Sequence, residues 1–401
     1  MKNDFDINRA RAETRYCEDI VHFNNAGAAL MPQPVADTLH NYLYKEERIG
    51  GYETANEEQE ALDHFYSATA KLLSCEVDEI TFVENATRAW DMAFYSFNFS
   101  PGDKILTTLA EYGSNVIAYN QQVQRYGVEL IFVPNDEFGQ IDTQALENLI
   151  DDRVKLISLS HIPTGGGLVN PAGAVGRIAQ SANIPFLLDA TQSVGQLPLD
   201  VDKIGCDMLC GTGRKYLRGP RATGLLYVRK NLIEQLEPPL LDQHAATLTS
   251  PTTYQIRPDA KRFETWEQHL AGKAALGVAI DYALSFGLEA IQSRIYHLAE
   301  QLRNNLLSLE GVELTDDGLE KCGLVTFTTA QLSPSTIKQR LKEHRINVST
   351  SKGSGSLVSF QHRGLTEVVR ASVHYYNTDQ EIDYFIATLQ SILRQKANAP
   401  E

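Results

Sequence analysis

The chain has 401 residues, of which 43% are hydrophobic, and it carries a formal net charge of −15. This length and composition predict a globular protein of two or three structural units with a large core. The acidic balance disfavours nucleic acid and anionic lipid surfaces as partners. No run reaches the roughly 18 apolar residues of a membrane span, and the first 20 residues lack the apolar core of a signal peptide. We therefore expect a cytoplasmic protein that binds neither membranes nor nucleic acid.

The cysteines are odd in number and scattered, at positions 17, 75, 206, 210 and 322, which is not the pattern of a disulfide framework. Cys206 and Cys210 are four residues apart, but the next cysteines lie more than a hundred residues away. We expect no metal site and interpret this pair as small buried hydrophobic residues.

Seven short apolar or β-branched runs follow one another, and each ends in polar or small residues. They cover residues 79–87, 104–112, 129–136, 154–162, 185–193, 206–213 and 223–230. Helical spacing of apolar residues occurs between most of them, at 87–97, 114–127 and 171–183. This alternation predicts an α/β fold with a mostly parallel seven-stranded sheet that is covered on both faces.

From about residue 270 the pattern changes to two long helices, at 270–287 and 291–311, followed by a few strands and a final helix. This change predicts a second, smaller α+β domain. We place the large domain at residues 25–285 and build the small domain from residues 1–24 and 286–401. No internal repeat or low-complexity linker is visible.

Ligands of open parallel sheets bind beyond the carboxyl ends of the strands, so the polar residues there are the candidates. They include an acid, a lysine, hydroxyls, an aromatic ring and short glycine- or alanine-rich segments, which together suit an anionic aromatic cofactor. The residues are Asn85, Thr87, Glu111, Tyr112, His161, Thr164, Asp189, Gln192 and Thr212 through Lys215.

Pyridoxal 5'-phosphate requires a lysine for its aldehyde, a carboxylate for its pyridine nitrogen, and backbone N–H groups and hydroxyls for its phosphate. Lys215 and Asp189 supply the first two. Thr212 and Thr87 can donate to the phosphate, and Tyr112 can cover the ring. An isolated aspartate after a strand is usually a helix cap and an isolated loop lysine is usually solvated, but their joint occurrence favours the cofactor.

The segment "LLDATQSVGQLPLDVDKIGCDMLCGTGRKYLRGPRATGLLYV" (187–228) resembles the core of class V aminotransferase-fold enzymes. That group contains cysteine desulfurases, selenocysteine lyases, isopenicillin N epimerase-like proteins and ergothioneine-type carbon–sulfur lyases. The resemblance covers nearly the whole chain, from "HFNNAGAALMPQPV" (22–35) to "VVRASVHYYNTDQEID" (368–383). It implies fold type I of the pyridoxal phosphate enzymes, an amino-acid substrate and a homodimer.

The resemblance also implies roles for individual residues. Lys215 matches the lysine that forms the Schiff base, Asp189 the partner of the pyridinium and Arg370 the arginine that grips the substrate carboxylate. Asn25 matches a segment that lines the substrate pocket. Tyr112, a third catalytic candidate, falls where many relatives stack a histidine on the ring. The other cofactor-binding positions are Ala86, Thr87, Thr164, Gln192, Thr212 and Arg214, and the glycines of the lysine loop let the backbone close on the cofactor. Arg218 and Arg221 either belong to the site or anchor this loop.

Two departures from the resemblance stand out. Cysteine desulfurases use a cysteine on a mobile loop, and Ser354 occupies that position here, with no cysteine between residues 323 and 401. A serine hydroxyl is a poor thiophile and cannot hold a persulfide. Relatives also often donate a threonine to the partner subunit's phosphate, and here Glu267 takes that position, with Thr265 two residues earlier as the candidate.

Several reactions remain open once Lys215 has removed the substrate's α-hydrogen. The missing cysteine and the resemblance of the "HFNNAGAAL" and "GRKYLRGPR" segments favour a carbon–sulfur lyase. Such an enzyme eliminates sulfur from a cysteine conjugate or cysteine sulfoxide and yields pyruvate and ammonia. The alternatives are a class V aminotransferase, an amino-acid epimerase, an atypical cysteine desulfurase or selenocysteine lyase, and a non-catalytic interaction domain.

Overall fold

A computed structural model describes residues 5–397 of the chain. Its larger sheet has seven strands: β2 (Ile80–Val83), β3 (Lys104–Thr108), β4 (Glu129–Val133), β5 (Val154–Ser160), β6 (Phe186–Asp189), β7 (Met208–Thr212) and β8 (Gly224–Val228). All seven predicted strands are present, in the order β2-β8-β7-β6-β5-β3-β4. The sheet is mostly parallel as predicted, but β8 runs antiparallel to both β2 and β7. The loop 213–223 reverses the chain there without a crossover helix.

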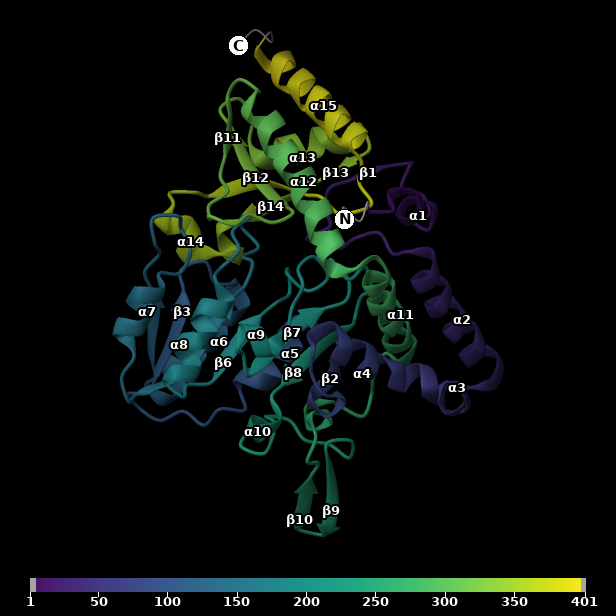
Figure 1. Cartoon of the computed structure of the whole chain (residues 1–401), viewed down its shortest axis with the longest axis vertical. Coiled ribbons are helices and arrows are strands. Elements are labelled where there is room, and N and C mark those ends of the chain that lie inside the picture. The colour runs from purple at the N-terminus through teal and green to yellow at the C-terminus, as the bar shows by residue number, and fades with distance from the viewer. Residues whose placement is uncertain (1–4, 398–401) are drawn as a thin grey trace.

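Helices cover both faces of this sheet (Figure 1). They include α5 (Ala86–Phe94), α6 (Gly113–Tyr126), α7 (Thr143–Leu149), α8 (Ala172–Ser181) and α9 (Val201–Ile204). Strand side chains alternate between the two layers of the core. In β6, Phe186 and Leu188 pack into one hydrophobic cluster and Leu187 into the other. Burial on both faces explains why these strands are almost continuously apolar.

The N-terminal part and the edge of the large sheet add further elements. These are α1 (Ile7–Ala12), β1 (Val21–His22), α2 (Gln33–Ile49), α3 (Gly51–Glu57), α4 (Gln59–Leu73), α10 (Lys230–Ile233) and the 3-10 turns η1 (Val77–Glu79) and η2 (Ala260–Phe263). Strands β9 (Ala246–Ser250) and β10 (Thr253–Ile256) form an antiparallel hairpin that projects from the body of the protein (Figure 1).

A second sheet, in the order β11-β12-β15-β14, is antiparallel throughout. Its strands are β11 (Val312–Leu314), β12 (Leu324–Thr329), β14 (Ser349–Lys352) and β15 (Glu367–Ser372). Around it lie α12 (Leu288–Leu307), α13 (Pro334–Glu343), η3 (Gly353–Gly355), α14 (Leu357–His362) and α15 (Asp379–Ala397). Strand β13 (Ile346–Asn347) pairs with β1, which joins residues 21–22 to this unit. The exact domain boundaries stay a prediction.

Helix α11 (Leu270–Phe286) joins the two units and meets α12 at a bend of 79°. Gly287 at the bend has φ +83°, a conformation that favours glycine. Among residues 5–397 no single helix is long and apolar enough to cross a bilayer, although α11 and α12 taken as a bent pair meet that test.

Arg218 anchors the loop between β7 and β8, which settles one of the alternatives left open by the sequence. The side chain is fully buried, and the backbone is left-handed with φ +59°. Its guanidinium donates to Leu30 O at 2.8 Å, Tyr375 Oη at 3.0 Å and Thr14 Oγ1 at 2.6 Å, and it lies over the ring of Tyr376. One cation thus ties the loop to the N-terminal segment and to residues 375–376.

Two glycines of this loop leave room for neighbouring side chains. A Cβ atom on Gly213 would lie closest to Oγ1 of Thr223, and one on Gly213 or Gly219 would lie 2.8 Å from Cδ1 of Leu276, a residue of α11. That these glycines also let the backbone close on a cofactor stays a prediction.

Candidate active site

A cavity opens at the carboxyl ends of the central strands, where the sequence predicts the site. Most of the predicted site residues line it, namely Ala86, Thr87, Tyr112, Thr164, Asp189, Gln192, Thr212, Arg214 and Lys215. The other lining residues are Asn85, Asn115, Ser160, Ile162 and Thr191. Strands far apart in the sequence thus bring an acid, a lysine and an arginine to one place.

Lys215 lies three residues after β7 and is buried. Burial, followed by the positive charges of Arg214 and Arg370, lowers the pKa of this lysine to about 7, although Asp189 acts in the opposite direction. In a large fraction of the molecules, this side chain is therefore an uncharged amine at neutral pH. The uncharged amine is the form that attacks an aldehyde.

Asp189 ends β6, and both of its carboxylate oxygens are held. Oδ1 accepts from the backbone N–H of Thr191 at 3.0 Å, and Oδ2 accepts from Nδ2 of Asn115 at 3.1 Å. A carboxylate fixed in this way at a cavity wall can accept a further hydrogen bond from a protonated ring nitrogen.

The anion-binding end of the cavity combines a helix start with a cation. Asn85 caps α5 by accepting from the N–H of Arg88, and the backbone of Ala86 and Thr87 begins the helix. The first N–H groups of a helix have no partner within it and attract phosphate groups. Arg214 also lines this cavity and donates to the carbonyl of Gly27. The hydroxyl of Thr212 donates to Thr223 O at 3.1 Å.

Arg370 comes from β15 of the second sheet and is buried. Its Nη1 donates to the hydroxyl of Thr164 at 2.6 Å and to the carbonyl of Thr164 at 3.2 Å. Nε of Arg370 is buried with no partner in the described part of the chain. Burial and the charge of Arg214 lower the pKa of Arg370 to about 10. This guanidinium therefore keeps unsatisfied donor capacity beside the cavity.

Gln192 has a similar unsatisfied atom. Its Nε2 donates to Ala26 O at 3.2 Å, whereas Oε1 is buried without a partner among residues 5–397. Buried polar atoms without partners are rare in folded proteins and often face a ligand site. Together with the lysine, the fixed carboxylate and the helix start, these atoms fit a bound pyridoxal phosphate molecule.

Asn25, Thr265 and Arg370 are not among the residues that line this cavity, although Arg370 contacts the lining residue Thr164. The side chain of Asn25 is fully used, since it donates to His22 O and Ser372 O and accepts from the hydroxyl of Tyr376 at 2.6 Å. Its observed role is to fix the N-terminal segment. The hydroxyl of Thr265 donates to the carbonyl of Glu267 at 3.1 Å.

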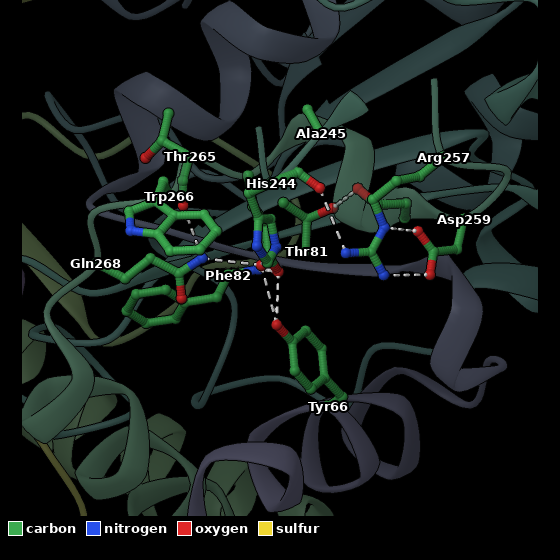
Figure 2. A network of polar contacts seen from close by, with 12 residues as sticks. Tyr66, Thr81, Phe82, His244, Ala245, Arg257, Asp259, Thr265, Trp266 and Gln268 are labelled. Atoms are coloured by element: carbon green, nitrogen blue, oxygen red, sulfur yellow. Dashed lines mark hydrogen bonds and ion pairs between the residues drawn. The ribbon is translucent and has the colours of Figure 1, made fainter. Parts of the chain in front are cut away.

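The buried carboxylate of Glu264 holds the segment that carries Thr265. It accepts from Tyr66 Oη at 2.8 Å, His244 Nε2 at 2.9 Å and Gln268 Nε2 at 2.9 Å, three side chains that converge in Figure 2. Burial alone would raise the pKa of Glu264, but the hydrogen bond from His244 and the charge of Lys273 lower it to about 2. The segment is therefore fixed outside the cavity of its own chain.

Tyr112 caps α6 and lies at the cavity mouth with 38% of its surface exposed. The next residue, Gly113, packs against the turn η3, since a Cβ there would lie 2.9 Å from Ser354 O. The turn that carries Ser354 thus rests on the start of α6 beside Tyr112.

The residues described here include all five cysteines, and none of them lines the cavity. Cys210 is buried in β7, and burial followed by the charge of Asp189 raises its pKa well above the ordinary value. Cys17, Cys206 and Cys322 are also buried, and Cys75 is half-buried. Burial raises the pKa of each of these four thiols.

Sequence reasoning missed Asn115, Ser160, Ile162 and Thr191 as lining residues. Asn115 lies inside α6 and not at the end of a strand, so the search of strand ends passed over it. The available clue was its spacing of four residues from Glu111, which places two polar groups on one side of a helical turn.

Comparison with known proteins gives one consistent result. The family model described as aminotransferase class-V matches residues 21–385. A probable cysteine desulfurase of Methanothermobacter thermautotrophicus is 28% identical over 389 residues, covering 95% of this chain and 97% of the relative. The apo structure of a cysteine desulfurase from Thermococcus onnurineus NA1 superposes with a TM-score of 0.90 at 25% identity, covering 97% of this chain and 98% of that chain. The cystine C–S lyase C-DES, solved with its product cysteine persulfide, shares the fold with a TM-score of 0.84 at 23% identity, over 94% and 99% of the two chains.

Proposed function

Because this chain belongs to the aminotransferase class V family of pyridoxal phosphate enzymes, we propose that it acts on its amino-acid substrate as a carbon–sulfur lyase. In this reaction the Cα–H and Cβ–S bonds break, and the sulfur fragment leaves as a thiol or a related acid. Water then converts the three-carbon fragment to pyruvate and ammonia.

The observation that carries this proposal is the absence of a cysteine from the cavity lining in residues 5–397. Transfer of sulfur to the protein needs a thiolate that can reach the substrate. Burial raises the pKa of every cysteine in the chain, which keeps these thiols protonated at neutral pH. Elimination needs only a base and a leaving group, and the cavity supplies the base.

The residues assigned to the cofactor divide into three groups. Lys215 holds its aldehyde and Asp189 its ring nitrogen, while the start of α5 and Arg214 hold its phosphate. Gln192 lies where its free Oε1 can meet a further polar group. Held by these residues, the cofactor would supply an electron-withdrawing group for the substrate's α-carbon.

Two residues then act on the substrate. Arg370 binds the α-carboxylate through its unpartnered Nε and the free N–H groups of its fork, while Thr164 holds the other side of the guanidinium. Lys215 Nζ removes the proton from the α-carbon, and its lowered pKa of about 7 suits a base that works near neutral pH.

Cysteine desulfuration is a second candidate, because the curated relatives bear that name. It would require a cysteine from elsewhere to approach the cavity mouth near Ser354. The fold itself is compatible with either chemistry, since C-DES is a cystine C–S lyase.

We also infer a homodimer. The hairpin β9–β10 and the segment after η2 expose Leu248, Tyr254 and Trp266, which are 70%, 54% and 59% accessible. Exposed apolar side chains on a projecting hairpin and on the segment after η2 favour contact with a second copy of the chain. A cytoplasmic location stays a prediction from the sequence.

A substrate panel tests the proposed reaction class. Purified holoenzyme is incubated with cysteine S-conjugates and cysteine sulfoxides, with and without a 2-oxo acid acceptor, and pyruvate, ammonia and the amino acid formed from the acceptor are measured. A lyase produces pyruvate and ammonia in equal amounts without the acceptor. Turnover that depends on the acceptor would show an aminotransferase instead.

A further inference from the structure

A row of buried polar side chains lies behind Asp189, on the side of α6. Nδ2 of Asn115 donates to Oδ2 of Asp189 at 3.1 Å and to Oε1 of Glu111 at 2.9 Å. All three residues are buried. A primary amide has two N–H groups, so this one is fully used between the two carboxylates. Because both neighbours are acceptors, they also fix which way the amide points.

Glu111 accepts hydrogen bonds on both oxygens. Oε1 receives the backbone N–H of Tyr112 at 2.8 Å in addition to Asn115, and Oε2 receives Thr107 Oγ1 at 2.9 Å and the N–H of Ser160 at 3.2 Å. The hydroxyl of Ser160 also donates to Oε1. Backbone and amide N–H groups can only donate, so each oxygen is held as an acceptor, as in an ionised carboxylate.

This carboxylate has no ion-pair partner within the described residues 5–397, since Glu111 takes part in none of their salt bridges. The pKa of Glu111 is raised above its ordinary value, because burial and the negative charge of Asp189 raise it by more than the hydrogen bonds from Ser160, Tyr112 and Asn115 lower it. An uncompensated buried carboxylate is costly for folding, so its position directly behind Asp189 calls for an explanation. The negative charges of Asp189 and Glu111, linked through the amide of Asn115, favour the protonated form of a base that lies next to Asp189.

We propose that Asn115 and Glu111 are positioning residues that make Asp189 hold a proton on the ring nitrogen of the bound cofactor. Asn115 fixes the orientation of the carboxylate, and Glu111 places a second negative charge behind it. The proposal rests on the cofactor and not on the choice between elimination and other reactions, so failure of the lyase assignment leaves it intact.

The experiment uses holoenzyme loaded with cofactor that carries ¹⁵N in its ring, because the ¹⁵N chemical shift reports protonation of that nitrogen without turnover. Glu111→Gln removes the charge but keeps an oxygen for Asn115 and Tyr112, whereas Asn115→Ala removes the link. In both variants we expect the ¹⁵N resonance to move toward that of unprotonated pyridine. We also expect the dissociation constant of the cofactor to rise roughly 3- to 10-fold.

Glu79→Gln is the matched control, since Glu79 is also a buried carboxylate that accepts a backbone N–H, that of Lys230 at 2.7 Å. It precedes β2, at the opposite end of that strand from the cavity residue Asn85. Its substitution should leave the ¹⁵N shift unchanged. A wild-type ¹⁵N shift in cofactor-loaded Glu111→Gln or Asn115→Ala would overturn the proposal. An equal displacement of the shift in Glu79→Gln would do the same. If Glu111→Gln does not bind the cofactor, the same measurement on Asn115→Ala tests the proposal.

Discussion

Arg370 of β15 is hydrogen-bonded at the cavity to Thr164 in the loop after β5, since Nη1 of the arginine donates to the threonine hydroxyl at 2.6 Å. Nε of the same guanidinium is buried and has no hydrogen-bond partner among the residues that the structure describes. Because Thr164 holds one side of the Arg370 guanidinium, the other side is already oriented to bind a carboxylate.

Removal of this fork should weaken substrate binding without affecting the cofactor. We expect Arg370→Ala to raise the KM for the amino acid by an amount equivalent to roughly 1.5–3 kcal/mol, the contribution of a charge-assisted hydrogen bond. Thr164→Val should have a smaller effect in the same direction. Steady-state kinetics and the visible spectrum of the holoenzyme provide the check. An unchanged KM with a lost cofactor spectrum would place Arg370 on the cofactor instead.

The lowered pKa of Lys215 predicts a defined pH dependence for cofactor attachment. Its pKa of about 7 lies below the ordinary value of 10.5, and only the uncharged amine attacks the aldehyde. The rate at which the apoprotein forms its covalent linkage should therefore rise with pH, with a midpoint near 7, and level off above it. Stopped-flow absorbance measures this rate.

Lys215→Ala is the control for that measurement and should abolish both the linkage and turnover. A linkage that persists in this variant would move the site to another lysine. A midpoint near 10 would show that the cavity does not depress the pKa of Lys215.

Arg218 should matter for stability. Arg218→Ala removes three hydrogen bonds and a ring contact from the loop that precedes β8. We expect the free energy of unfolding of the apoprotein to fall by roughly 2–4 kcal/mol, as for loss of a buried network. The exposed Arg221 in the same loop is the control, since surface substitutions usually change stability by less than about 0.5 kcal/mol. Equal losses in the two variants, measured by urea unfolding, would refute the anchoring role.

Glu264 should make stability depend on pH in the acid range. Its pKa is about 2 in the folded protein and 4.5 in the unfolded chain, so the unfolded state binds more protons between these values. The stabilisation from this group is complete above pH 4.5 and is lost as the pH falls toward 2, for a total of roughly 3 kcal/mol. Urea unfolding of the wild type and Glu264→Gln between about pH 2.5 and 6.5 checks this. The difference between them should shrink on acidification, and a constant difference would contradict it.

The parts of the structure that the sequence predicts well are those governed by local patterns. Each strand of the large sheet is a short apolar run with a polar end, and Asp189 and Lys215 follow two such runs directly. The antiparallel direction of β8 was not predicted, because direction depends on the path of the connecting loop and not on periodicity.

The side chains that were misjudged depend on partners distant in the sequence. The side chain of Asn25 forms hydrogen bonds with Ser372 and Tyr376, far along the chain. The role of Asn115 depends on its hydrogen bond to Asp189, 74 residues away. Packing across such separations leaves no trace in the spacing of a single sequence.

The fate of the sulfur is the most direct test of the proposed lyase activity. The holoenzyme is given a cysteine conjugate, the three-carbon product is identified, and the intact protein mass is recorded after turnover, with Lys215→Ala as the inactive control. Pyruvate should accumulate in step with the released sulfur fragment, and the protein mass should not change. In a parallel reaction with free cysteine, formation of alanine together with a protein that has gained one sulfur atom on one of its five cysteines would contradict the account and show a desulfurase.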